Sequence, residues 1–229
     1  IPGVVAMLLL AQIRHRVPSV TEPDPADLEP SADQTAPTGL WSTVIGADLP
    51  RDFHLFSLAV ALTTAGLMTF GVISYRFVEA GLISLAAAPL VYAMAMAVEA
   101  VAALATGDLY DRYGGRVLLA VPVIVSAVPA LVFAPHLTPV LGGIVLWGLA
   151  TGIQDSTVKA FVADLVPSRR RATAYGVFAA VQGLGAIAGG VLAGALATDH
   201  AGTLAGTIGL LQACSFVLLV RLTRSPARH

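Results

Sequence analysis

Three charged side chains interrupt long apolar stretches of this sequence, and they are the residues best suited to chemistry. Glu99 stands alone in one stretch, whereas Asp155 and Lys159 share another and lie four residues apart. A carboxyl group removed from water disfavours its charged form, so it can take up and release a proton. An acid followed by a base at this spacing lies on one face of a helix, where the two can pair.

Two interpretations of these residues fit the sequence. In the functional one, the three charges and the polar side chains of Thr151 and Gln154 form a site for a substrate or a proton. In the structural one, Asp155 and Lys159 neutralise each other, and Glu99 makes a hydrogen bond to a neighbouring helix or a partner. Lys159 also lies near enough to the end of its stretch to extend its ammonium group into water.

The remaining reactive side chains form no pattern typical of a catalytic or metal site. Cys214 is the single cysteine, so the chain has no internal disulfide. Neither His-Glu-x-x-His nor Gly-x-Ser-x-Gly occurs, which disfavours an enzyme. The histidines lack the close spacing of metal ligands; they are His15, His54, His136, His200 and His229. We expect no enzyme activity, no metal and no cofactor.

The segments that carry these residues are too apolar for a soluble fold. Hydrophobic residues make up 56% of the 229 residues and charged residues 12%, whereas soluble domains hold roughly 25% charged residues. A bilayer crossing needs about 20 apolar residues. Because the connections between apolar runs are short, we predict six transmembrane helices, each antiparallel to the one before, in an all-α membrane protein. The six runs are 53–75, 80–107, 117–135, 137–163, 172–198 and 201–220.

Basic residues mark the sides of the membrane. Eleven of the thirteen basic residues lie before the first run, in every second connection or after the last run. Because cytoplasmic loops retain Lys and Arg, both ends of the six-helix bundle are predicted to face the cytoplasm. The use of arginine rather than lysine suggests a bacterial cell membrane. The net charge of −1 offers no basic surface for a nucleic acid, so the expected partner is the lipid bilayer.

The sequence before the first run divides into two regions. Residues 1–16 are apolar up to a short basic cluster, and we expect them to be the end of a truncated transmembrane helix. Residues 17–52 hold six prolines and seven acidic residues with a single basic one. This composition predicts a disordered, acidic, Pro-rich cytoplasmic linker. Residues 53–229 then form the six-helix transmembrane domain.

The run 172–198 is rich in glycine. It contains two Gly-x-x-x-Gly spacings, which let helix backbones approach closely. We expect this run to pack tightly against a neighbouring helix. The glycines concerned are Gly183, Gly185, Gly189, Gly190 and Gly194.

The connection between the second and third runs is short and charged. Its glycines permit a tight turn, and its charges anchor both helix ends at the membrane surface. It resembles the signature loop of the major facilitator superfamily, with matches at Gly107, Leu109, Asp111, Arg112, Gly114 and Arg116. It departs from the family at Gly115, where the family usually has an arginine.

A second connection supports the resemblance. Asp164–Gly176 is similar to the family's loop between the fourth and fifth helices of one half, with its acid, proline, arginines and following glycine. The resemblance covers the whole chain and implies the C-terminal half, helices 7 to 12, built from two inverted three-helix repeats. It also implies that Asp111 pairs with Arg171 as a cytoplasmic latch. The matching loop residues and Arg171 then form a gating motif.

The resemblance carries an expectation about function. The chain would take part in secondary active transport of a small-molecule substrate by alternating access, together with the N-terminal half of the same transporter. The run with Asp155 and Lys159 would line the central cavity, and proton coupling through Glu99 is one option. The alternative is a non-transporting membrane receptor or assembly partner on the same scaffold, because a fold does not fix a function.

Overall fold

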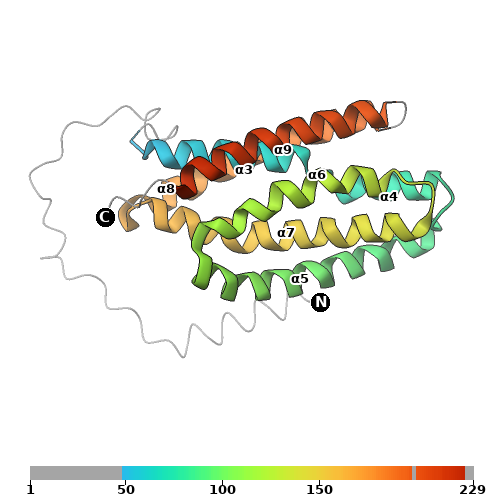
Figure 1. Cartoon of the computed structure of the whole chain (residues 1–229), viewed down its shortest axis with the longest axis horizontal. Helices are drawn as coiled ribbons and strands as arrows, with labels where there is room; N and C mark the ends of the chain where they lie inside the picture. Colours follow the sequence, from blue (N-terminus) through green and yellow to red (C-terminus); the bar gives the residue numbers. More distant parts are fainter. Residues whose placement is uncertain (1–47, 198–199, 225–229) are drawn as a thin grey trace, which may run out of the picture. The chain divides into compact units, whose positions relative to one another are not determined.

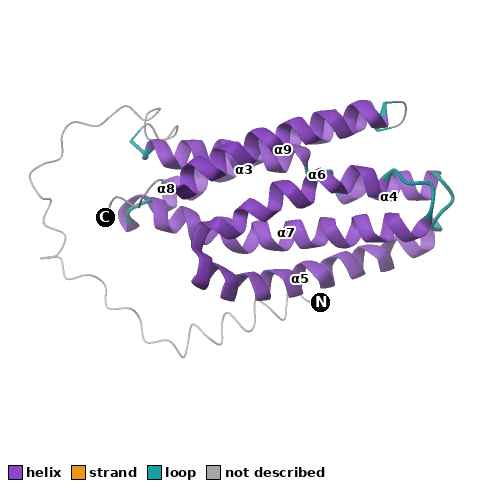
Figure 2. Ribbon diagram, in the orientation of Figure 1, coloured by secondary structure: helices purple, strands orange, loops and turns teal. Residues whose placement is uncertain are grey.

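The regular elements of the structure, a computed structural model that describes residues 48–197 and 200–224, are all helices (Figure 2). This confirms the predicted all-α class for the described residues. The predicted truncated helix, residues 1–16, and most of the predicted linker, residues 17–52, lie outside them. In chain order the elements are α3 (Arg51–Gly66), α4 (Phe70–Glu79), η2 (Leu85–Ala87), α5 (Ala88–Tyr113), η3 (Gly114–Leu119), α6 (Ala120–Val132), α7 (Leu137–Leu165), η4 (Ser168–Arg170), α8 (Arg171–Leu196) and α9 (Ala201–Arg224).

Five helical segments are long and apolar enough to cross a membrane. Four of them each correspond to one predicted run, but Leu85–Val132 is 48 residues long and contains two. Between those two runs, where a short connection was predicted, α5 continues to Tyr113 and the chain then forms the 3-10 helix η3. Gly114 begins this turn with φ of 60°, a left-handed conformation that favours glycine. Figure 1 shows the chain reversing its direction at η3.

Close backbone contacts reveal the relative direction of α5 and α7. A Cβ atom at Gly148 of α7 would lie 2.6 Å from the carbonyl oxygen of Ala95. One turn later, a Cβ atom at Gly152 would meet the carbonyl oxygen of Glu99. Because the residue numbers rise together on both helices, α5 and α7 run parallel. The intervening α6 also packs against α7.

The glycine-rich α8 packs on α3 in the same way. A Cβ atom at Gly185 would meet the carbonyl oxygen of Ala61, and one at Gly189 would meet that of Ala65. These two helices are therefore parallel and in close contact, as the Gly-x-x-x-Gly spacing predicts. In contrast, Gly190 and Gly194 have nothing within 4 Å of a Cβ atom and lie on an open face.

The first apolar segment is broken in the middle. α3 ends at Gly66 and α4 begins at Phe70, so the predicted single helix 53–75 is two helices that continue to Glu79. Leu67 and Thr69 have ψ of 94° and 147°, which are extended values. The break contains no proline. Side chains from other elements hold the two helices in place.

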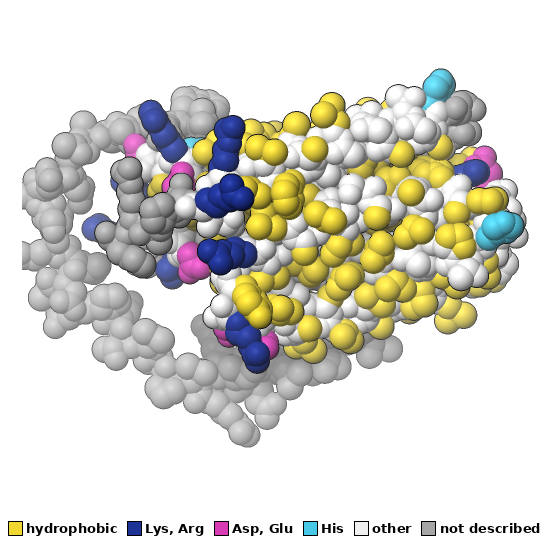
Figure 3. Space-filling view, in the orientation of Figure 1, with side chains coloured by type: hydrophobic (Ala, Val, Ile, Leu, Met, Phe, Trp, Pro, Cys, Tyr) yellow, Lys and Arg dark blue, Asp and Glu magenta, His cyan; other side chains and the backbone are white. Residues whose placement is uncertain are grey.

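Arginine side chains gather at one end of the described helices (Figure 3). That end is formed by the last turn of α5 with η3, by η4 with the start of α8, and by the last turn of α9. The opposite end carries Arg76, His136 and His200. The described helices therefore have one basic end and one nearly neutral end.

Candidate functional site

Two charged side chains lie on the one open side of the middle of α7. From Leu146 to Ala163, every residue is buried or half-buried except Asp155 and Lys159, which are exposed. Four residues of helix place these two on the same face, one turn apart. Neighbouring helices therefore cover this stretch of α7 on all sides but one, and Asp155 and Lys159 both lie on that uncovered side.

Asp155 and Lys159 do not form the predicted ion pair. Among the described residues, the ion pairs are Arg76–Glu79 at 3.4 Å and Arg112–Asp108 at 2.9 Å. An exposed pair on one helix gains roughly 0.3–0.5 kcal/mol, which is too little to hold two mobile side chains together. Both charges are therefore open to another partner.

Glu99 adds a second carboxylate next to α7. Its backbone oxygen lies against Gly152, three residues before Asp155. Its side chain is half-buried and experiences the negative charge of Asp155. The structure thus brings Glu99, Asp155 and Lys159 together at the α5–α7 pair, and we call these three residues the charged strip.

Gln154 does not join the charged strip, whereas Thr151 lies one turn before Asp155 on the same face of α7. The Thr151 hydroxyl donates to the carbonyl oxygen of Trp147 in its own helix, at 2.8 Å. Gln154 is 4% exposed, and its Nε2 donates to the Thr64 hydroxyl of α3 at 3.1 Å. Gln154 therefore belongs to a second polar cluster, around the break between α3 and α4.

The second polar cluster was not predicted from the sequence. Trp147 of α7 donates its indole N–H to the carbonyl oxygen of Met68, within the break, at 2.7 Å. This bond satisfies a buried acceptor that the interrupted helix leaves without its usual partner. The indole ring also lies 5.8 Å from the Phe70 ring at the start of α4, between centroids. Trp147 thus connects α7 to both sides of the break.

α9 supports the end of α3 from another side. Gln212 is 2% exposed and donates through Nε2 to the carbonyl oxygen of Thr63 at 3.3 Å. The hydroxyls of Thr63 and Ser215 are 2.7 Å apart. The Oε1 atoms of Gln154 and Gln212 are buried without a hydrogen-bond partner. The polar residues within the apolar runs were the feature of the sequence that could have indicated this cluster. Sequence spacing, however, does not reveal which helices they connect.

The gating motif is arranged differently from the prediction. Arg112 pairs with Asp108 within α5, and the Tyr110 hydroxyl donates to Asp164 of α7 at 2.6 Å. Leu109 is partly exposed, and a Cβ atom at Gly107 would have nothing within 4 Å. The motif therefore presents an open surface, and Tyr110 attaches it to α7.

The predicted latch between Asp111 and Arg171 is not formed. Arg171 instead donates to the carbonyl oxygens of Ala163 and Val166, at 3.0 Å and 3.4 Å, and so caps the last turn of α7. These carbonyls lack partners within their helix, which makes a guanidinium a favourable donor. Asp111 is exposed and makes no ion pair among residues 48–197 and 200–224.

Two further motif positions have clear physical roles. Gly115, the departure from the family, lies against the ring of Phe161 in α7, where any Cβ atom would collide with the ring. A small residue is therefore required for η3 to pack there. Arg116 is exposed at the basic end, beside the other arginines.

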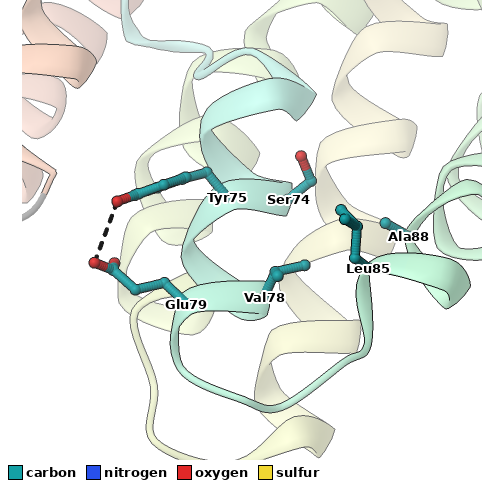
Figure 4. Close-up of a pocket in the computed structure, with 6 residues that line it drawn as sticks. All are labelled: Ser74, Tyr75, Val78, Glu79, Leu85 and Ala88. Carbon is teal, nitrogen blue, oxygen red and sulfur yellow. Dashed lines mark hydrogen bonds between the residues drawn. The ribbon is translucent and has the colours of Figure 1, made fainter.

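A cavity of about 470 Å³ opens at the opposite end, between α4 and the start of α5. Figure 4 shows Tyr75 and Glu79 joined on one side of α4, with Val78 and Leu85 toward α5. The Tyr75 hydroxyl donates to Glu79 at 3.3 Å, and Arg76 occupies the other oxygen of this carboxylate. The Ser74 hydroxyl donates to the carbonyl oxygen of Gly71, so the polar side chains of this cavity already have hydrogen-bond partners.

The site chemistry is that of charge and hydrogen bonding. In the part of the chain that the structure describes, no three His, Cys, Asp or Glu side chains are grouped to hold a metal ion. The charged strip offers two carboxylates and one ammonium group, which can bind ions, accept hydrogen bonds and exchange protons.

Comparisons with known proteins agree with this architecture. A sequence profile of the Major Facilitator Superfamily matches residues 42–229. Uncharacterized proteins of Mycobacterium bovis and Mycobacterium tuberculosis are 40% identical to this chain over 98% of its length. The chain spans about half of these relatives, 53% of their length. No solved structure matches the chain. The chain is therefore a multi-pass membrane protein that belongs to the Major Facilitator Superfamily.

Proposed function

We propose that this chain forms one half of a secondary transporter and that the charged strip faces its solute pathway. The observation that carries the proposal is the exposure of Asp155 and Lys159 in the otherwise covered stretch of α7 from Leu146 to Ala163. A charged side chain at the centre of a bilayer costs roughly 2.5–3.5 kcal/mol on insertion scales, so such residues face a cavity or a partner. Contact between this side of α7 and lipid is therefore energetically unfavourable.

Helix directions support six crossings of the membrane. α5 and α7 run parallel, so the chain must return once between them, and α6 is the element available. At 1.5 Å per residue, a continuous helix of 48 residues would be about 72 Å long, more than twice the roughly 30 Å of hydrocarbon. Leu85–Val132 therefore crosses twice, which gives helices 7 to 12 of the family's bundle.

The basic end supports the orientation. The arginines at the ends of α5, α7 and α9 mark the cytoplasmic side under the positive-inside rule. The arrangement favours a cell membrane protein whose linker, residues 17–52, and C-terminus are cytoplasmic. The cavity beside Tyr75 then opens on the external side.

A second half completes the pathway in this proposal. The chain covers 53% of its relatives, and transporters of this superfamily move two six-helix halves around a central site. The N-terminal half would cover the open side of α7 and the surface of the gating motif. Asp111, which has no ion pair in the described residues, is then available to contact that half.

The break in the first span is the proposed hinge. Broken helices at membrane depth occur in transporters where the backbone is buried by protein or lines a cavity. The two unpartnered amide oxygens of Gln154 and Gln212 lie at this break. An alternative position of α4 that pairs them would recover part of the roughly 1–3 kcal/mol that each unsatisfied group costs.

Exchange by reconstituted protein tests the proposal. The chain is co-produced with the N-terminal half, placed in liposomes, and screened for counterflow of radiolabelled solutes. Counterflow of at least one solute is expected, and Glu99→Gln tests proton coupling: gradient-driven accumulation is lost and exchange is kept. Absence of any counterflow, with specific binding retained, would instead support a receptor.

A further inference from the structure

We propose that the charged strip binds a small zwitterion, with Asp155 holding its cationic group and Lys159 its anionic group. This inference rests on the proposed transport function and names its substrate class. Asp155 and Lys159 are exposed on the same face of α7, and neither forms an ion pair within the described residues. A solute with one charge of each sign would satisfy both side chains at once.

The spacing fits such a solute. Four residues of helix separate Asp155 and Lys159 by about 6 Å along the axis, a distance that flexible side chains adjust to ligands of several lengths. Tyr175 of α8 donates its hydroxyl to the carbonyl oxygen of Lys159 at 2.9 Å. This bond fixes the backbone that carries the ammonium group, while the side chain stays exposed.

The distribution of charge along the charged strip determines the orientation of the ligand. Glu99 and Asp155 together carry two negative charges beside the single positive charge of Lys159. The cationic group of the solute therefore lies toward Glu99 and Asp155. Its anionic group lies toward Lys159, the end of α7 nearer the basic surface.

Other solute classes fit less well. A phosphate ester would meet two carboxylates, and Lys159 is the single basic residue of α7. Lysine is also a point charge without the planar fork with which arginine grips phosphates. An uncharged solute would leave both the acid and the base without an oppositely charged partner.

Matched ligands test this assignment in the complete transporter. Ligands that share a carbon skeleton, 4-aminobutyrate, n-butylamine and butyrate, are compared in binding and counterflow, with alanine, glycine betaine and a hexose alongside. We expect at least one zwitterion to bind at least tenfold more tightly than its matched amine or acid. Binding of another class alone would overturn the inference and leave transport intact, whereas absence of all counterflow would refute the proposed function.

Two substitutions resolve the roles of the charges. Lys159→Gln should weaken binding of the zwitterion at least tenfold and leave binding of the matched amine unchanged. Asp155→Asn should weaken binding of both ligands. Arg224→Gln, which removes an exposed arginine at the end of α9, is the control and should change neither. If either variant folds poorly, Lys159→Arg and Asp155→Glu keep the charges and should retain the preference. Equal losses for zwitterion and amine in Lys159→Gln would overturn the assignment.

Discussion

Trp147→Phe should loosen the break between α3 and α4. The substitution keeps an aromatic ring near Phe70 but removes the indole N–H, which donates to the carbonyl oxygen of Met68 at 2.7 Å. Met68 is 3% exposed, so water cannot replace the lost donor in the closed structure. A buried acceptor left without a partner costs about 1–3 kcal/mol. At 1.4 kcal/mol per factor of ten, the break should open about 5- to 150-fold more often.

Hydrogen exchange of the protein in lipid nanodiscs measures this opening. The amides that should exchange faster are those of Leu67, Val72 and Ile73, which bond to carbonyl oxygens beside the break. Thr151→Val is the control, because its hydroxyl bonds only to a carbonyl oxygen of its own helix. If Trp147→Phe folds normally and these amides exchange no faster than in the control, the hinge does not depend on Trp147 and the reasoning fails.

Two other contacts lead to predictions of stability. Gly189→Ala should lower the free energy of unfolding by about 1–3 kcal/mol, because the added Cβ atom would meet the backbone of Ala65. Gly190→Ala, on the open face of the same helix, should be neutral or stabilising by up to about 1 kcal/mol, and equal losses would contradict the packing. Tyr110→Phe should lower stability by about 0.5–1.5 kcal/mol, and in a double-mutant cycle with Asp164→Ala the two losses should not add. Additive losses would show that this hydrogen bond contributes nothing.

The helices could be predicted because membrane crossing depends on local properties. Each apolar run became helical, since a backbone in lipid must satisfy its hydrogen bonds within its own segment. The Gly-x-x-x-Gly spacing likewise predicted close packing, which Gly185 and Gly189 make against α3. Length and hydropathy thus indicate which residues are helical, and the glycine spacing indicates which face allows close approach.

The partners of polar side chains could not be predicted in the same way. In one of the two interpretations Asp155 pairs with Lys159 because they share a helical face, but that face is open and the pair is not formed. Arg171 was assigned to Asp111, yet the nearby end of α7 offers it unpaired carbonyl oxygens. Such choices depend on three-dimensional distances between helices, which sequence spacing does not contain.

The break in the first span was missed for a related reason. It contains no proline, and Thr63, Thr64 and Gly66 are only weak interruptions of a helix. What stabilises the break lies far away in the sequence, on α7 and α9. The donors there are Trp147 and Gln212, and the sequence does not show which segment each of them contacts.

The most direct test of the central claim is thiol labelling of α7 in the complete transporter. Single cysteines are introduced by Asp155→Cys, Lys159→Cys and Ile153→Cys in a Cys214→Ala background, and the protein in lipid nanodiscs, where both membrane faces are accessible, is treated with a water-soluble thiosulfonate. If the open side of α7 faces the solute pathway, the cysteines at 155 and 159 should react. The cysteine at the buried position 153 should stay unmodified. A lack of reaction at 155 and 159 in folded protein, while a cysteine introduced at the basic end reacts, would contradict the account.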